Sequence, residues 1–441
     1  MEKRKTLAIR SSVLAVAAAF CAVPHVHAAQ PVEAESTVQL YGHLDMSIDD
    51  ANKGLSNYSA AVGKLGWQAD ISSNLSRIGV RGSRDLGEGL KAVFQIETQV
   101  DVSSNPGGST VPDNTVKGAF ASRNSFLGLA GGFGSFKVGK SDAPYKLSTG
   151  RMDPFSATVG DYNSIIGNTG GDNRAEFDTR LNHAMWYDSP NMGAFSFSAL
   201  YAPGQNRSTD NSAAASGEPD CTGGNQPTCN DGSFGDAISI AGRFNSGPLY
   251  AIAAYEVHKK VNRTGDEAGT VPAGAVGVVD ETGEKIGAQY KLSNTTLNAI
   301  YERLTRNAPV ADFNERQHNA YWLALTQKLT EKDDFNLGWA HAGKTPGGPG
   351  SATMKDGTLA VGAGLDDEAN MYAIGYKHHW DKQTTWYAVY AQQSNHAAAH
   401  YDLGASGHGI TTDCHDSNPL GASCFSGAKL QAVSVGMTYN F

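Results

Sequence analysis

Segments of about ten residues in which apolar and polar side chains alternate recur along the whole chain, and they limit what it can fold into. In the last of them, Val433, Val435, Met437, Tyr439 and Phe441 alternate with small or polar residues. Because successive side chains of a strand point to opposite faces, each segment predicts a β-strand with one apolar face. No stretch beyond the N-terminal leader has the roughly 18 consecutive apolar residues of a membrane-spanning helix, whereas this alternation is typical of transmembrane β-barrel strands.

The connections between these segments alternate in length. Seven are tight, and they read "RDLGEGLK", "AGGFGS", "SPNMGAF", "FNSGPL", "KLSNTTL", "LTEKDDF" and "HWDKQTT". Long connections fall between them. The sequence therefore predicts an all-β fold, a transmembrane antiparallel β-barrel of about 16 strands with short periplasmic turns and long external loops.

A soluble β-sandwich or propeller would show the same alternation, and two features argue for a barrel in lipid instead. The second face of the segments is polar and carries charge, which suits a water-filled lumen better than a second packed sheet. Tyr and Trp recur near segment ends, as at Trp322 and Trp380, where a membrane interface favours aromatic side chains.

Residues Gly134–Ser141, "GSFKVGKS", match the P-loop pattern of nucleotide-binding proteins. That loop cradles phosphate only between a buried strand and a helix. Here Pro144 stands where the helix would begin its second turn, and Phe136 and Val138 alternate with polar residues. The match therefore predicts a strand and no phosphate site.

Residues 1–28 have the basic start, apolar stretch and small residues of a secretory signal peptide, with cleavage near Ala28 and Ala29. Residues 29–441 have a uniform texture without a linker, which predicts a single barrel domain. Removing four basic residues and one acidic residue from a chain of formal net charge −9 leaves a net charge of about −12. This charge argues against nucleic acid as a partner.

Four cysteines follow the leader in two local pairs, Cys221 with Cys229 and Cys414 with Cys424. An exported chain meets an oxidising compartment, so the pairs predict two small disulfide-closed loops. Zinc ligation is the alternative, but the spacings are not of the C-x-x-C kind.

The last long connection contains four histidines and several aspartates. The histidines are His396, His400, His408 and His415. Neighbouring glycines argue against the rigid helix that would align them on a metal, so a solvated loop is predicted, without metal or cofactor.

Several stretches resemble the Gram-negative general porins of the β-proteobacterial type. They are "VQLYGHLD", "SRIGVRGSRDLGEGLKAVFQIE", "SRNSFLGLAGGFGSFKVGK", "RLNHAMWYDSP" and "VSVGMTYNF". The resemblance covers the chain after the leader and implies a homotrimer of sixteen-stranded barrels, each a water-filled channel for small hydrophilic solutes. It also implies an inward-folded third loop, contact with outer-membrane lipid and lipopolysaccharide, and an assembly machinery that reads Phe441 as part of its signal.

The third long connection, about residues 141–178, is the constriction loop that this resemblance implies. If it folds inward, its carboxylates face the barrel wall, and the candidates are Asp153, Asp161, Asp172 and Glu176. Strand alternation places Arg77, Arg81, Lys91 and Arg180 on the lumen face, and the resemblance adds Arg123. A basic wall opposite an acidic loop creates a transverse field that filters ions by sign.

The same alternation assigns further basic residues to the lumen. They are Arg243, Lys285, Lys291, Arg303, Lys328 and Lys377, against the acidic Asp45, Glu97 and Glu256. Salt screens charges beyond about 8 Å at physiological ionic strength, so residues at the narrowest section decide selectivity. The sequence predicts weak anion preference despite the acidic net charge.

Passive diffusion is therefore the predicted function, without a reaction. An outer-membrane enzyme is the second class, but no G-x-S-x-G or other nucleophile motif occurs. An adhesin or receptor barrel, binding through its long loops, is the third. A substrate-specific channel would need an aromatic or lysine ladder in the lumen, which alternation alone does not locate.

Overall fold

The computed structural model describes most of the chain after the leader. The described residues are 36–56, 66–103, 120–167, 177–203, 234–262, 278–306, 317–344, 351–353, 359–361, 366–397, 399, 401–404, 408, 410 and 427–441. The chain divides into two compact units, Met1–Ser36 and Thr37–Phe441, and the second contains the sheet.

Several predicted features lie outside the described residues. They are the leader 1–28 with its cleavage site, both cysteine pairs (Cys221, Cys229, Cys414 and Cys424), the loop carboxylates Asp172 and Glu176, and the histidines His400 and His415. The disulfide bonds and the signal peptide therefore stay predictions.

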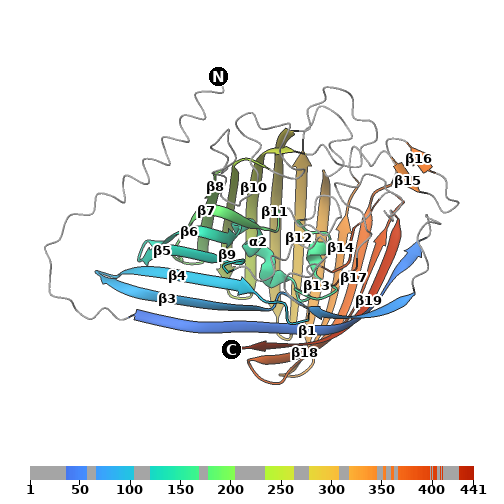
Figure 1. Cartoon of the computed structure of the whole chain (residues 1–441), viewed down its shortest axis with the longest axis horizontal. Coiled ribbons are helices and arrows are strands. Elements are labelled where there is room, and N and C mark those ends of the chain that lie inside the picture. Colours follow the sequence, from blue (N-terminus) through green and yellow to red (C-terminus); the bar gives the residue numbers. More distant parts are fainter. Residues whose placement is uncertain are drawn as a thin grey trace. The chain divides into compact units, whose positions relative to one another are not determined.

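Seventeen strands of the described chain form one antiparallel sheet (Figure 1). They are β1 (Ser36–Ser56), β2 (Trp67–Ser73), β3 (Arg77–Gly87), β4 (Leu90–Gln99), β5 (Ser125–Gly131), β6 (Gly134–Asp142), β7 (Arg180–Asp188), β8 (Phe195–Ala202), β9 (Ala237–Ser246), β10 (Leu249–Asn262), β11 (Val278–Leu292), β12 (Thr295–Arg306), β13 (His318–Lys328), β14 (Asp333–Ala342), β17 (Ala369–His379), β18 (Thr384–Asn395) and β19 (Ala428–Asn440). A separate hairpin joins β15 (Ser351–Thr353) to β16 (Leu359–Val361).

The sheet closes on itself because β1, the first strand, pairs with β19, the last. Both β2 and β3 pair with β1, so the seventeen strands occupy sixteen positions around the barrel. The interruption lies at Leu75, whose φ of 56° breaks the extended backbone. Ser76 Oγ there accepts the Asp45 N–H at 2.9 Å, in place of a backbone carbonyl. The predicted barrel of about 16 strands is confirmed.

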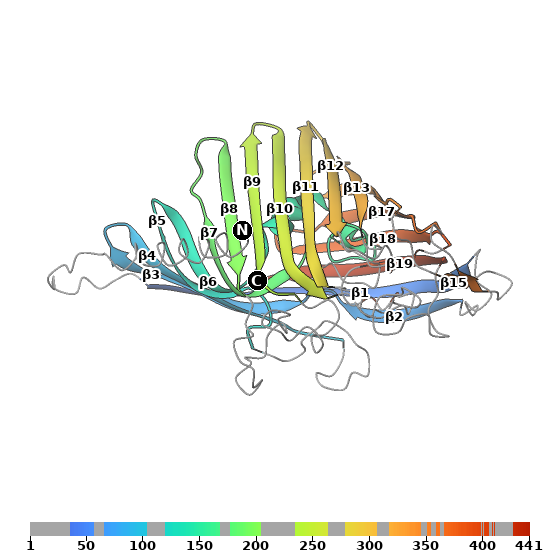
Figure 2. The same cartoon turned by 90° about the horizontal axis from the view of Figure 1, so that it is seen from above.

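All seven predicted tight turns join consecutive strands of the described chain. Figure 2 shows neighbouring strands from β8 to β12 side by side in sequence order. Gly87 and Gly89 flank the first turn with φ of 92° and 76°, a region that favours glycine because it has no Cβ. The P-loop match Gly134–Ser141 lies within β6, so its prediction as a strand is confirmed.

The strand faces follow the predicted alternation in β19. Val433, Val435 and Met437 are 43, 52 and 50 % exposed, whereas Ser434 between them is buried. Large apolar side chains are exposed in the same way on strands all around the sheet, for example Leu127 on β5 and Ile286 on β11. Such a continuous apolar outer surface is stable in hydrocarbon and unstable in water.

No described helix combines the length and the apolar character needed to cross a membrane. The helices present are short and belong to the third long loop: α2 (Pro144–Thr149) and the 3₁₀ turns η1 (Gly150–Met152) and η2 (Tyr162–Ser164). Helix α2 lies against β9 and β10. Buried apolar residues of this loop form clusters with inner-face residues of strands between β7 and β19, so the core of the protein lies inside the sheet.

Candidate functional site

The third loop rests on a part of the inner wall where glycines make room for aromatic rings. A Cβ on Gly338 of β14 would lie 2.4 Å from the Trp322 ring and 2.9 Å from the Phe155 ring. A Cβ on Gly283 of β11 would lie 2.8 Å from the Phe177 ring. These glycines leave the space in which Trp322 of the wall and the aromatic residues of the loop pack, so they help to position the loop.

Trp322 of β13 holds the middle of this loop. Its Nε1 donates a hydrogen bond to the Met152 carbonyl at 3.1 Å. Its ring meets those of Phe155 and Tyr162 at centroid distances of 6.3 and 5.9 Å, both in edge orientation. Trp322 is fully buried, so its predicted place among the interfacial aromatic residues is wrong. Its alternation with the exposed Tyr321 and Leu323 was the signal that could have shown this.

A buried polar cluster holds the two ends of the loop. Glu302 of β12 accepts the Tyr145 hydroxyl at 2.8 Å and the Gly167 backbone N–H at 2.6 Å. Lys285 of β11 lies 2.5 Å from Asp178 and 3.9 Å from Glu302, between fully buried side chains. One lysine thus joins the wall to both ends of the loop, and the inward-folded third loop is fixed by named contacts.

Asp153 and Asp161 lie inside the loop and away from the opposite wall. Asp153 accepts the backbone N–H groups of Phe155 and Tyr162 at 2.9 and 3.2 Å. Asp161 likewise accepts those of Ala157 and Asn163, at 2.7 and 2.9 Å. Both are buried, and desolvation raises the pKa of each carboxyl, which further lowers the negative charge that the loop presents. They fold the loop, in contrast to the expectation that they face the wall.

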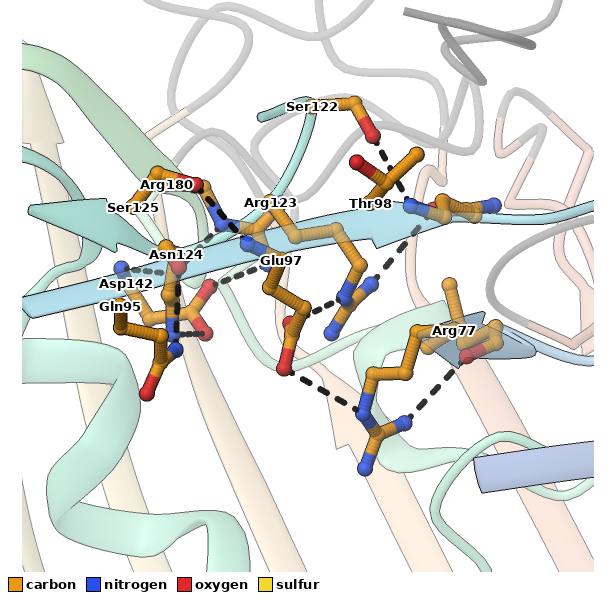
Figure 3. Close-up of polar contacts among 12 residues, drawn as sticks. Arg77, Gln95, Glu97, Thr98, Ser122, Arg123, Asn124, Ser125, Asp142 and Arg180 are labelled. Carbon is orange, nitrogen blue, oxygen red and sulfur yellow. Dashed lines mark hydrogen bonds and ion pairs between the residues drawn. The ribbon is translucent and has the colours of Figure 1, made fainter. Parts of the chain in front are cut away.

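The arginines Arg77, Arg123 and Arg180 come together on β3 to β7, with carboxylates between them (Figure 3). Arg123 Nε lies 2.7 Å from Glu97 Oε1, and Arg77 Nε lies 3.8 Å from Glu97 Oε2. The Tyr41 hydroxyl donates a further hydrogen bond to Glu97 at 2.9 Å. Glu97 therefore bridges Arg77 of β3 and Arg123, which lies just before β5.

Arg180 is held by a second acidic residue at the end of β6. Its guanidinium lies 3.0 Å from Asp142, which also lies 3.6 Å from Lys146 of the loop. Asn124 accepts from Arg180 Nε at 2.7 Å and donates to Asp142 at 2.8 Å. The role of Asn124 was not predictable from the sequence, because an uncharged residue before a strand carries no signal of it.

Of the two other predicted wall residues, Arg81 lies near this cluster and Lys91 does not. Arg81 lies four residues after Arg77 on the same face of β3. It donates a hydrogen bond to Gln39 at 3.1 Å and stacks over the Tyr41 ring. Lys91 is the second residue of β4, beside the turn. It lies six residues or roughly 20 Å along the strand from Glu97, so it does not join the cluster.

One of the further lumen positions predicted from alternation, that of Arg303, is wrong. It is exposed on the outer face of β12, between the buried Glu302 and Leu304. On β12, the basic Arg303 therefore faces outward, and the acidic Glu302 faces the lumen.

Comparison with known proteins agrees with this architecture. A family model described as Gram-negative porin matches residues 14–398. Major outer membrane protein P.IB of Neisseria meningitidis serogroup B is 31 % identical over 185 residues, which are 42 % of this chain and 50 % of that protein. The chain thus spans about half the length of the curated relatives it matches.

Two solved structures show the same fold at low sequence identity. The anion-selective porin from Comamonas acidovorans matches with a TM-score of 0.62 and 22 % identity, over 92 % of this chain and all of that chain. The trimer form of OmpT from Vibrio cholerae matches with a TM-score of 0.54 and 14 % identity, over 92 % of this chain and 99 % of that chain.

Proposed function

Because this chain belongs to the Gram-negative porin family, we propose that it forms a diffusion channel for ions and small hydrophilic solutes in the outer membrane. The observation that carries the proposal is the arrangement inside the closed barrel. A docked loop lies against one part of the wall, and a cluster of arginines lines another. The protein needs no reaction or cofactor for this function.

Weak anion preference is the finer part of the proposal. Among the described residues, the wall and the start of the loop bring five cations together, Arg77, Arg81, Arg123, Arg180 and Lys146, in contact with the carboxylates of Glu97 and Asp142. The two described carboxylates expected to oppose them are turned into the loop. The excess of positive charge favours anions at the narrow section. The similar Comamonas protein is itself described as anion-selective.

The first prediction concerns the unmodified protein in a planar bilayer. We expect steady ohmic conductance steps and, in a salt gradient, a reversal potential of the sign that indicates anion preference. Absence of conductance steps would instead favour the adhesin or receptor alternative. Clear cation preference would mean that carboxylates outside the described cluster dominate the narrow section.

Trimer formation, contact with lipid and lipopolysaccharide, and recognition by the assembly machinery are parts of the same proposal. The similar OmpT structure is a trimer form, and the apolar outer surface suits both lipid and a neighbouring barrel. The proposed assembly signal, Phe441, also closes the barrel. Its N–H donates to the Gly42 carbonyl at 3.1 Å, and its carbonyl accepts the Gly42 N–H at 3.0 Å.

The second prediction is that Phe441→Ala lowers the yield of outer-membrane barrel. The variant keeps these backbone hydrogen bonds but loses the ring, which occupies the space beside Gly42. Heat-modifiable migration of the outer-membrane fraction measures the yield, and Phe441→Tyr, which keeps an aromatic ring, is the matched control. Wild-type yield for Phe441→Ala would contradict the proposed role.

A further inference from the structure

The last long loop, which follows β18 and returns to β19, packs several of its residues into the interior. Ala399, Tyr401, Leu403 and Ile410 are at most 4 % exposed and belong to the same apolar cluster as the third loop. The described part of this loop therefore differs from the predicted solvated loop. We call its described residues 399, 401–404, 408 and 410 the inward segment.

Contacts with β18 and with the third loop position the start of the inward segment. The Asn395 amide makes two hydrogen bonds to the Tyr401 backbone, both at 2.9 Å. The Gly404 N–H donates to Ser164 Oγ of the third loop at 3.0 Å. Gly404 has φ of 77°, and a Cβ there would lie 3.1 Å from Val159 Cα. This position therefore accepts only glycine without strain, and the two loops touch at it.

His408 joins the inward segment to the first strand. Its Nδ1 donates to Asp49 Oδ2 of β1 at 2.7 Å, and the two side chains are 0 and 1 % exposed. Ser72 Oγ donates to the same Asp49 oxygen at 2.6 Å. A carboxylate removed from water in this way depends on its remaining donors, so loss of the imidazole leaves it poorly compensated.

The inward segment therefore extends across a wide part of the inner wall. At one end His408 contacts β1, and at the other the Tyr401 ring meets His318 of β13 at 6.1 Å. Between β1 and β13 lie β19, β18, β17 and β14 in order of pairing. The segment thus spans the inner faces of six neighbouring strands and rests on the third loop.

We infer that the inward segment is a second constriction element, which limits the size of the solutes that reach the arginine cluster. The His408–Asp49 contact holds the segment against β1, and the fit of Gly404 holds it against the third loop. The inference rests on the proposed channel function and adds a size limit to it, determined by named residues of the last loop.

Two variants test this role. His408→Ala removes the donor to Asp49, and Gly404→Val places a branched side chain against Val159 in an unfavourable backbone conformation. Each should raise the population of the undocked segment by a factor on the order of 10 to 100. His396→Ala is the matched control, because His396 belongs to the same loop but its side chain is partly exposed and hydrogen-bonds to Asp366.

The measurements are single-channel conductance and the swelling rate of proteoliposomes in sugars of increasing size. We expect higher conductance and faster entry of the larger sugars for His408→Ala and Gly404→Val, and wild-type values for His396→Ala. Asp49→Asn, which keeps an acceptor for His408, gives a milder change and serves if His408→Ala does not assemble.

Unchanged conductance and an unchanged size limit in assembled variants would overturn the inference, since the segment would then lie beside the path of the solute. A lower unfolding temperature alone, without altered permeation, would show a structural role only and would also overturn it. Absence of conductance steps in the unmodified protein would contradict the proposed function itself, so the two failures are distinguishable.

Discussion

Lys285→Met should release the third loop from the wall and raise the conductance of the channel. Lys285 is the cation between two buried carboxylates, Asp178 at 2.5 Å and Glu302 at 3.9 Å. Removing one partner of a buried ion pair costs about 3 to 5 kcal/mol, because the remaining charge has no compensation. Both ends of the loop depend on this cluster, since Glu302 also accepts from Tyr145 and Gly167.

The thermal midpoint of barrel unfolding and the single-channel conductance measure this effect. Lys328→Met is the matched control, because Lys328 is exposed at the turn end of β13 and should tolerate the change. Adding Asp178→Asn and Glu302→Gln to Lys285→Met removes the uncompensated charges and should restore part of the stability. A wild-type midpoint for Lys285→Met alone would show that the buried cluster does not hold the loop.

Arg123→Gln should move the reversal potential toward cation preference. Arg123 is the arginine closest to Glu97, and its removal exposes the negative charge of that residue to the lumen. A unit charge about 5 Å from a passing ion in water changes its energy by about 0.8 kcal/mol, which corresponds to a factor of about 4 in relative permeability. The effect should diminish at high salt, because the Debye length falls to about 3 Å at 1 M.

Arg303→Gln is the matched control for this experiment. It removes the same charge from the outer face of β12, so the reversal potential should stay at the wild-type value. A shift with Arg303→Gln as large as with Arg123→Gln would mean that selectivity follows the total charge of the protein. No shift with Arg123→Gln would place the narrow section away from the arginine cluster.

Strands and turns were predictable because their signals are local. Alternation with a period of two depends only on neighbouring residues, and the tight turns are marked by Gly, Asn, Asp and Pro. Seven turns and the barrel of sixteen positions follow from these signals. The strand at Gly134–Ser141 was separated from a P-loop by the same local evidence.

The error at Arg303 has a physical cause. Assigning the lumen face from alternation assumes that apolar residues face lipid and polar residues face water. Where the third loop packs on the wall, the inner face is apolar as well, and Leu304 lies buried among Tyr145 and Phe177. The rule therefore reverses beneath the loop.

By itself, the sequence determined the strands, their turns and the closed barrel. It also determined that basic residues of β3 and β7 face the lumen. These features depend on contacts between near neighbours or successive strands. Only the tertiary structure decided which way the loop carboxylates turn. Asp153 reaches the backbone of Tyr162, and His408 of the last loop reaches Asp49 of the first strand. The His408–Asp49 contact joins residues far apart in the chain, and it forms only because the closed barrel brings the last loop and the first strand into one interior. The Asp153 contact is local, but the direction of its carboxylate depends on how the whole loop folds inside the barrel.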